Sequence, residues 1–383
     1  MTTDLSKLTT PFTFKHGATI KAPIAMSPMV PKAAETDGTI GADALAFYGA
    51  RSNAAGLLIT GAANVNEAGD GFDRGVAISD DKYLPGLTKL AATMKQDGNK
   101  ALVQLYHGGR EAYEAQKHLG HTVAPSAIKF PFLPYTPEAM TETEIEQTIQ
   151  DFAAAAHRAI VAGFDGVEIH GANHYLLQQF FSSYSNHRTD KWGGSLEKRM
   201  AFPLAVVKAV KDVVAKEAPD DFIVVYRISP DEIHGDTIGY TVDDALKLID
   251  KVADFDLDYI HTSIFTGYST VPEGHNKSYG ELVKDTVAGR AATIIVSSVF
   301  TPADAIDALN YGDIVAIARE ALMEPQFLAK LQAGKAADIV SAITPDRVAD
   351  LKFTPELADW FLMDNSPMLP LPGQENLKPL LKK

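Results

Sequence analysis

The sequence of 383 residues contains no cysteine, and this absence excludes several classes of protein at once. Disulfide bonds, thiolate nucleophiles, cysteine-ligated zinc and iron–sulfur clusters all require cysteine. Basic residues are also in deficit, because 35 Lys and Arg face 49 Asp and Glu and leave a net charge of −14. Such a charge disfavours binding to nucleic acid or to an anionic membrane surface. We therefore expect any bound phosphate to be held by a local site.

Long apolar runs are missing as well. The sequence has no stretch of about 18 apolar residues, which a membrane-spanning helix needs, and residues 1–17 lack the apolar segment of a secretion signal. These features predict a cytoplasmic protein. The chain does contain 46% hydrophobic and 22% charged residues, which is typical of a soluble protein with a large buried core.

Short apolar segments rich in β-branched residues alternate with amphipathic helical patterns along the chain. Capping boxes at Thr141 with Glu144 and at Thr241 with Asp244 mark two helix starts. Eight strands are predicted, at residues 24–26, 57–60, 102–105, 166–169, 223–227, 259–261, 294–296 and 314–317. Because no GxGxxG turn follows the first strand, the repeat predicts an α/β fold that is a single (β/α)8 TIM barrel spanning 1–383.

Two segments stand outside this repeat. Residues 111–140 are rich in proline and show no clear period, which predicts an excursion over the barrel mouth between strands 3 and 4. Residues 355–383 predict an irregular C-terminal tail. No linker, charge block or repeat divides the chain into separate domains.

The carboxyl ends of the strands should carry the chemistry, because (β/α)8 barrels build their active sites there. After the fourth strand, His170 and Asn173 can donate two N–H groups to one carbonyl or oxyanion. Tyr175 stays protonated at neutral pH and can give a proton to a carbanion. An ordinary structural role is the alternative for each. A metal site formed by His107, His170 and His174 is also open.

Other strand ends offer groups that suit a nucleotide cofactor. Arg227 closes a buried strand and needs an anionic or acceptor-rich partner, either a ligand or a salt bridge. The Gln104 amide can donate to and accept from a planar heterocycle. Ser298, Val299 and Arg319 follow strands seven and eight, where this fold often binds phosphate. Together these groups indicate a flavin mononucleotide site with a carbonyl substrate stacked above it.

Residues 163–200, GFDGVEIHGANHYLLQQFFSSYSNHRTDKWGGSLEKRM, resemble the signature block of the old yellow enzyme family. Members of this family are FMN-dependent NAD(P)H oxidoreductases (ene-reductases) that reduce activated alkenes. Similarity continues at 22–29 (APIAMSPM), 104–110 (QLYHGGR) and 313–322 (DIVAIAREAL), so it covers nearly the whole barrel. The resemblance implies noncovalent FMN as cofactor and NADH or NADPH as hydride donor.

The resemblance also implies roles for individual residues. His170 and Asn173 would bind the substrate carbonyl, and Tyr175 would donate the proton. The residues implied to bind the cofactor are Ser27, Pro28, Met29, Ala62, Gln104, Arg227, Ser298, Val299, Ala318 and Arg319. No metal ligand is implied. The implied reaction is ping-pong, with hydride passing through flavin N5 to an enone, maleimide, nitroalkene or quinone.

Five positions depart from the family pattern. Val30 stands where members often carry Thr or Cys, and Ala318 stands where they carry Gly. Ser297 and Ser298 replace a Gly pair, and Tyr106 replaces a Trp of some relatives, which should reshape the pocket wall. A metal-dependent lyase or epimerase and a noncatalytic flavin-binding protein are the alternative functions. The sequence leaves open the natural substrate, the choice of NADH or NADPH, and the oligomeric state, a homo-oligomer included.

Overall fold

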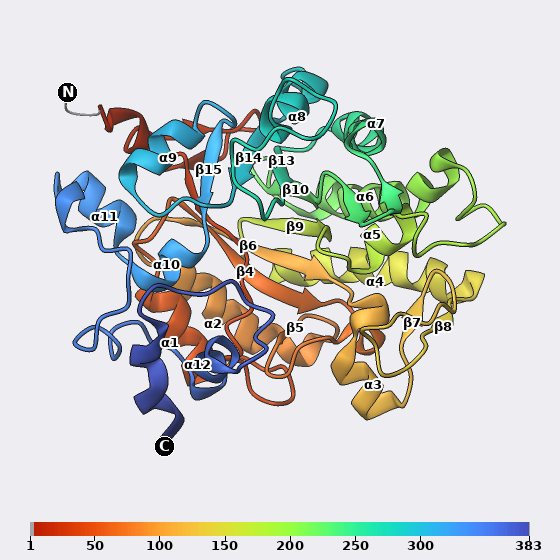
Figure 1. Cartoon of the computed structure of the whole chain (residues 1–383), viewed down its shortest axis with the longest axis horizontal. Helices are drawn as coiled ribbons and strands as arrows, with labels where there is room; N and C mark the ends of the chain where they lie inside the picture. Colours follow the sequence, from red (N-terminus) through yellow and green to blue (C-terminus); the bar gives the residue numbers. More distant parts are fainter. Residues whose placement is uncertain (1–3, 383) are drawn as a thin grey trace.

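Eight parallel strands form a closed barrel in the computed structural model, which describes residues 4–382 (Figure 1). They are β3 (Ile24–Met26), β4 (Leu57–Asn64), β6 (Lys100–Tyr106), β9 (Gly166–Gly171), β10 (Ile223–Ile228), β13 (Tyr259–Thr262), β14 (Ala292–Val296) and β15 (Ile314–Ile317). Hydrogen bonds join them in the order β3-β15-β14-β13-β10-β9-β6-β4, and pairing of β3 with β4 closes the ring. The predicted barrel is confirmed, and each predicted strand lies within an observed one.

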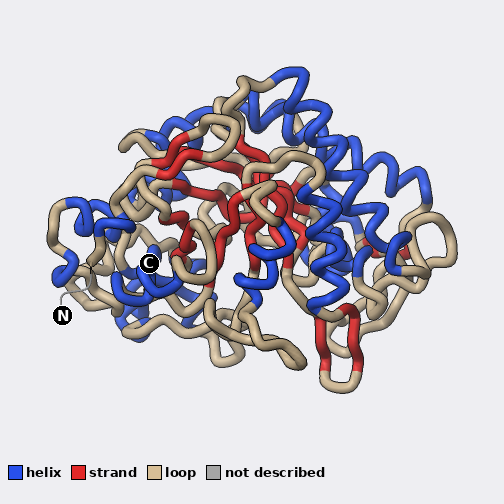
Figure 2. Tube along the Cα trace, turned by 90° about the horizontal axis from the view of Figure 1, so that it is seen from above, coloured by secondary structure: helices blue, strands red, loops and turns tan. Residues whose placement is uncertain are grey.

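Helices surround the strands, which gather in the middle of the molecule when it is seen from above (Figure 2). The helices of the repeat are α1 (Ala42–Ala50), α2 (Leu84–Lys95), α4 (Glu142–Val161), α6 (Leu196–Glu217), α7 (Val242–Ala253), α8 (Tyr279–Val287), α9 (Pro302–Ala308), α10 (Arg319–Met323) and α11 (Phe327–Gln332). Both predicted capping boxes are present, at the starts of α4 and α7. Within residues 4–382 no helix combines the length and the apolar character that a membrane span needs.

A hairpin covers the amino-terminal end of the barrel. It consists of β1 (Phe12–Thr13) and β2 (Thr19–Ile20), and Phe14 between them stacks on Tyr259 with ring centroids 5.6 Å apart. Phe14 and Ile20 are buried and belong to the apolar cluster that fills the barrel interior. Because the hairpin and this cluster occupy the amino-terminal half of the barrel, a site can form at the carboxyl ends of the strands.

The remaining elements are helices and short strands outside the barrel repeat. The 3-10 helices of the described residues are η1 (Ser6–Leu8), η2 (Glu67–Gly69), η3 (Asp81–Tyr83), η4 (Gly109–Glu111), η5 (Ala336–Asp338) and η6 (Gln374–Lys382). Strand β5 (Val76–Ala77) pairs with β4. The hairpin of β11 (Glu232–His234) and β12 (Thr237–Tyr240) follows β10, and α5 (Leu176–Phe181) follows β9. Residues 111–140 contain α3 (Tyr113–Leu119) and the parallel pair β7 (Val123–Ala124) and β8 (Glu138–Ala139), and β7 contacts α5.

The prediction of an irregular tail at 355–383 is wrong for residues 355–362 and 374–382, which form α12 and η6. Helix α12 (Pro355–Leu362) begins after Thr354, whose hydroxyl accepts a hydrogen bond from the Leu357 N–H (3.1 Å). Pro355 occupies the first helical position, where its missing N–H costs nothing, so this proline starts a helix rather than preventing one. An ion pair of Glu356 with Arg74 (3.4 Å) ties α12 to the loop after η2.

Candidate active site

A cavity of about 670 Å³ lies at the carboxyl ends of the barrel strands. The structure places every predicted site residue on its wall: Ser27, Pro28, Met29, Ala62, Gln104, His170, Asn173, Tyr175, Arg227, Ser298, Val299, Ala318 and Arg319. Of residues 111–140, Glu111 lines this cavity, and the tail contributes Trp360. The tail therefore forms part of the wall, a contribution that the sequence did not predict.

His170 lies next to the last residue of β9 and presents a hydrogen-bond donor to the cavity. Its Nδ1 accepts the backbone N–H of Ala172 (3.3 Å), which puts the imidazole proton on Nε2. Burial lowers the pKa of His170 well below its ordinary value, and the positive charge of Arg227 lowers it further. The imidazole is therefore neutral at physiological pH, with one acceptor occupied and one N–H available.

Asn173 follows in a left-handed backbone conformation (φ 58°), which Asn tolerates better than most residues. Its Oδ1 accepts a hydrogen bond from the Ser263 hydroxyl (2.8 Å), and that hydroxyl accepts one from Arg227 Nη2 (3.0 Å). Because Oδ1 is engaged, the amide presents its NH₂ group as the free donor. The chain of contacts from Arg227 through Ser263 thus sets the orientation of the Asn173 amide.

Tyr175 completes the group beside these donors. Its ring packs edge-on against His170 (centroids 5.1 Å apart) and against Tyr106 (4.6 Å). Burial raises the pKa of Tyr175 far above its usual range, and the negative charge of Glu111 raises it further. The hydroxyl is thus fully protonated at neutral pH. Tyr106, expected to reshape the pocket wall, is buried behind Tyr175 instead.

A buried polar ladder forms the floor of the cavity. Gln104 Nε2 donates to Glu168 Oε1 (2.7 Å), and His261 Nδ1 lies 2.8 Å from Glu168 Oε2. Burial opposes ionisation of Glu168, yet His261 and Arg227 hold the pKa of this carboxyl below its usual value. With its amide nitrogen committed to a carboxylate, Gln104 turns its carbonyl oxygen out as an acceptor. Arg227 Nε is buried and lacks a hydrogen-bond partner within the described residues.

The loop after β14 has the backbone of a glycine pair although it contains two serines. Ser297 and Ser298 both adopt positive φ values, of 101° and 57°. Such conformations cost about 1–3 kcal/mol each in residues other than glycine and are retained at functional sites. Nearby, the Arg319 guanidinium lies over the Phe300 ring (4.6 Å) and donates to the Pro370 carbonyl (3.1 Å). Both serines thus hold backbone conformations that glycine adopts more readily.

These features fit FMN. An acceptor at Gln104 and an unpartnered buried donor at Arg227 match the alternating polar edge of the flavin ring. The strained loop at Ser297 and Ser298, together with Arg319, offers backbone and side-chain donors at the position where this fold holds phosphate.

Several wall residues were not predicted from the sequence. Phe72 packs edge-on against Tyr175 (centroids 6.0 Å apart) and Trp360 (6.2 Å), so the three rings form an aromatic wall. Glu111 brings a carboxyl group to the cavity, and burial raises its pKa above the usual value. Ser263 ends residues 258–263 (DYIHTS), a further segment that resembles the same family, and this resemblance was the one available signal for it. Phe72 and Trp360 carry no comparable signal, because a single aromatic residue in a loop or a tail is common.

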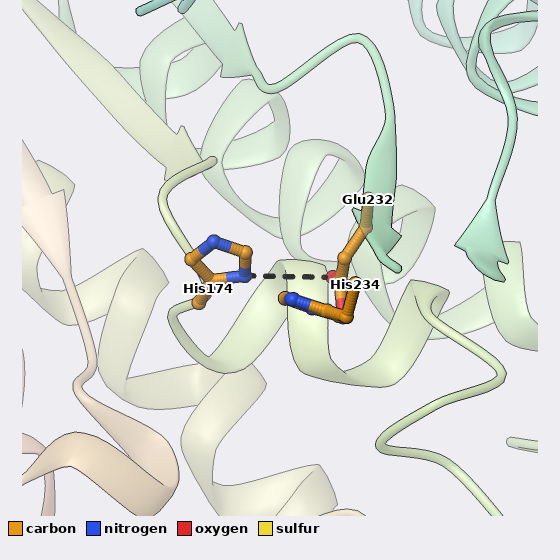
Figure 3. Close-up of side chains that lie close together, drawn as sticks. All are labelled: His174, Glu232 and His234. Carbon is orange, nitrogen blue, oxygen red and sulfur yellow. Dashed lines mark hydrogen bonds and ion pairs between the residues drawn. The ribbon is translucent and has the colours of Figure 1, made fainter. Parts of the chain in front are cut away.

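The structure does not bring together the three histidines of the metal alternative. His107 is buried, burial lowers its pKa to about 3, and its Nδ1 accepts the Gly109 N–H (3.0 Å). A different group lies close enough to share an ion, namely His174 with Glu232 and His234 (Figure 3). His170 and His174 both line the cavity described above, whereas His107 does not.

A (β/α)8 barrel with this constellation at its mouth defines the class of FMN-dependent oxidoreductases. The model of the NADH:flavin oxidoreductase / NADH oxidase family matches residues 7–338, and the chain belongs to this family, the old yellow enzymes. It is similar to "Probable NADH-dependent flavin oxidoreductase YqiG" of Bacillus subtilis (strain 168), with 41% identity over 87% of this chain and 90% of the relative.

Two further relatives bear on the chemistry. The NADH:acrylate oxidoreductase of Vibrio harveyi is 39% identical over 85% of this chain, which corresponds to 33% of that longer protein. The solved structure of morphinone reductase in complex with tetrahydroNAD superimposes with a TM-score of 0.74, at 29% identity, over 86% of this chain and 91% of that one. The protein is therefore an enzyme that uses FMN and a nicotinamide donor, and the lyase and the noncatalytic alternatives are set aside.

Proposed function

We propose that this enzyme reduces the activated C=C bond of α,β-unsaturated carbonyl compounds, with maleimides, nitroalkenes and quinones as related substrates. The observation that carries the proposal is the pair of donors on one side of the cavity. His170 and Asn173 each have their acceptor atom engaged by the protein, so each offers an N–H to a ligand. A substrate carbonyl is the group that such a pair recognises.

The cofactor would lie on the cavity floor and supply the hydride. When bound, FMN would supply the hydride for the β-carbon of the alkene, with NADH or NADPH as the source of that hydride. Gln104 would accept from the ring N–H, and Arg227 would donate to the opposite polar edge. The remaining predicted contacts with the cofactor come from Ser27, Pro28, Met29 and Ala62 at the ring and from Ser298, Val299, Ala318 and Arg319 at the phosphate.

The protein side chains would then stabilise the charge and move the proton. As hydride reaches the β-carbon, negative charge develops on the carbonyl oxygen, where each preorganised donor is worth about 3–4 kcal/mol. Tyr175 would give its phenolic proton to the α-carbon, since burial keeps that proton in place until the carbanion forms. The acrylate oxidoreductase among the relatives supports an activated alkene as the substrate class.

An anaerobic experiment tests the proposal. The oxidised enzyme is reduced under nitrogen with NADH or NADPH and is then mixed with 2-cyclohexenone, N-methylmaleimide, a nitroalkene or a quinone. Bleaching by a nicotinamide followed by reoxidation with the first three supports the proposal. Reoxidation by quinones alone would contradict it.

A binding titration tests the donor pair separately. A para-substituted phenol should bind as the phenolate above the oxidised flavin and create a long-wavelength charge-transfer band. His170→Ala and Asn173→Ala should each weaken this band and enone turnover together while FMN stays bound. Undiminished phenol affinity in either variant would remove that residue from the carbonyl site.

A further inference from the structure

Two histidines and a glutamate form a compact cluster beside the active-site turn, and the proposed reaction does not use it. His174, Glu232 and His234 each offer one ligand atom, and these atoms lie within 4.8 Å of one another (Figure 3). Glu232 Oε2 is 3.8 Å from His174 Nδ1, and Oε1 is 3.3 Å from His234 Nε2. Ligand atoms around one transition-metal ion lie about 3 Å apart, given bonds of about 2.0–2.2 Å. Small side-chain rotations would bring this cluster to that spacing.

The carboxylate of the cluster is held in position by neutral donors. The Glu232 side chain is fully buried, and it accepts hydrogen bonds from Gln178 Nε2 (2.7 Å) and from the Ser182 hydroxyl (2.9 Å), both on or next to α5. Neither donor carries a charge. Within residues 4–382, the ion-pair partners of this carboxylate are His174 and His234. A buried anion requires a compensating positive charge. A cation between the histidines would supply one.

The histidines complete a site that is both supported and accessible. His174 adopts a left-handed backbone (φ 67°), which is uncommon outside glycine and asparagine. The Gln178 side chain supports this turn, because its Oε1 accepts the His174 N–H (3.0 Å) while its Nε2 donates to Glu232. The side chains of His174 and His234 are 40% and 35% exposed, so water can reach the space between them.

We propose that His174, Glu232 and His234 bind one divalent transition-metal ion, such as Zn²⁺ or Ni²⁺, with water in the remaining coordination positions. Two imidazoles and one carboxylate are a ligand set that late first-row ions accept, and three protein ligands leave positions open. The ion would join the β11–β12 hairpin to the turn that carries Asn173 and Tyr175. The site is thus a metal clamp at the rim of the cavity, distinct from the flavin site.

The first experiment measures binding of Zn²⁺ to the FMN-loaded, tag-free protein by isothermal titration calorimetry. We expect one ion per chain. Loss of an outer-shell partner typically weakens metal affinity 10- to 100-fold, so removal of a ligand in His234→Ala or His174→Asn should weaken it at least 10-fold. His174→Asn is chosen because asparagine accepts the left-handed backbone. The matched control is His118→Ala, an exposed histidine outside the cluster, which should bind Zn²⁺ unchanged.

The second experiment detects the clamp independently of turnover. Hydrogen–deuterium exchange of residues 232–240 should slow when Zn²⁺ is added to the parent protein, and the effect should vanish in His234→Ala. His234 lies on an exposed hairpin outside the core, so we expect the variant to fold. Retention of FMN by the variant checks this. Absence of a Zn²⁺ isotherm, or an affinity that His234→Ala leaves intact, would overturn the proposal.

Discussion

The orientation of Asn173 depends on a residue that lines the cavity beside it. Asparagine can present either its oxygen or its nitrogen to a ligand, and the two choices have opposite chemical consequences. The Ser263 hydroxyl donates a hydrogen bond to Asn173 Oδ1, so the amide nitrogen faces the ligand. The oxygen of the same hydroxyl accepts a hydrogen bond from Arg227. Ser263 is therefore a positioning residue for the donor pair.

Replacing Ser263 by Ala should loosen this arrangement. A hydrogen bond of this kind is worth about 0.5–1.5 kcal/mol, so phenol affinity and kcat/KM for enones should each fall roughly 2- to 12-fold. Ser263→Thr keeps the hydroxyl and should restore both. Phenol titrations of FMN-loaded protein provide the measurement. If the alanine variant binds phenol as tightly as the parent, the amide is oriented by other contacts.

The proton donor can be separated from the rest of the site by its half-reactions. Tyr175→Phe should leave reduction of the flavin by NAD(P)H nearly unchanged, because that step needs no proton on carbon. Reoxidation by 2-cyclohexenone should slow by about 10²- to 10⁴-fold, the usual worth of general acid catalysis. Stopped-flow absorbance follows both steps, with a quinone as the matched control oxidant because its oxygens take protons from water. Equal slowing with enone and quinone would argue against a donor role.

At the scale of elements, periodic patterns were predictable and aperiodic contacts were not. The eight strands and the capped helices α4 and α7 follow from local sequence, because β-branched runs and capping boxes act over a few residues. Strand β4 was predicted to stop at Thr60 but continues to Asn64 through small residues after an irregularity at 59–62. A side chain on Gly61 would collide with the Met29 carbonyl, so tertiary packing, not propensity, selects these small residues.

The residues of the active site divide in the same way, into those that local sequence patterns predict and those that only tertiary contacts bring to the cavity. The residues at strand ends were predicted because the fold brings them to one rim, and all of them line the cavity. Helix α12 reaches the cavity only through contacts distant in sequence, such as the Thr354 hydroxyl with the Lys32 carbonyl (3.2 Å). No local sequence pattern predicts contacts between residues that are so far apart in the chain. For this reason Trp360 was missing from the predicted site although it forms part of the aromatic wall.

The contribution of α12 can be tested through substrate size. Trp360 lines the cavity and packs against Phe72, so Trp360→Ala should widen the site. We expect kcat/KM for 2-cyclohexenone to fall and that for an enone with a bulky aryl substituent to rise, changing their ratio at least 10-fold, within the range that pocket contacts give. Met363→Ala, at the exposed end of the same helix, is the matched control. An unchanged ratio would show that α12 does not contact the substrate.

At the scale of the whole molecule, most acidic residues lie at the surface and a few are buried. Glu324 is buried but paired with Lys330 (2.6 Å) and Arg347 (3.1 Å). Glu320, one helical turn earlier, is buried with both carboxyl oxygens lacking a hydrogen-bond partner among the described residues. Burial raises the pKa of Glu320 to about 8, and the negative charge of Glu324 adds to the shift. One internal carboxyl group is therefore protonated at neutral pH.

Protonation of Glu320 should make the stability of the fold depend on pH. Its folded pKa of about 8 lies above the ordinary glutamate pKa of 4.5, so the folded state binds the proton more tightly than the unfolded state does. The free energy of unfolding should therefore decrease as pH rises from about 4.5 to about 8, by at most about 5 kcal/mol at 1.36 kcal/mol per pKa unit. Glu320→Gln, which cannot ionise, should lose less stability between pH 5.5 and pH 8.5 than the parent. Thermal unfolding with saturating FMN measures this difference, and Glu138→Gln, an exposed carboxyl, is the control. Parallel losses in Glu320→Gln and the parent would mean that Glu320 ionises at its ordinary pKa, with its charge compensated inside the folded protein.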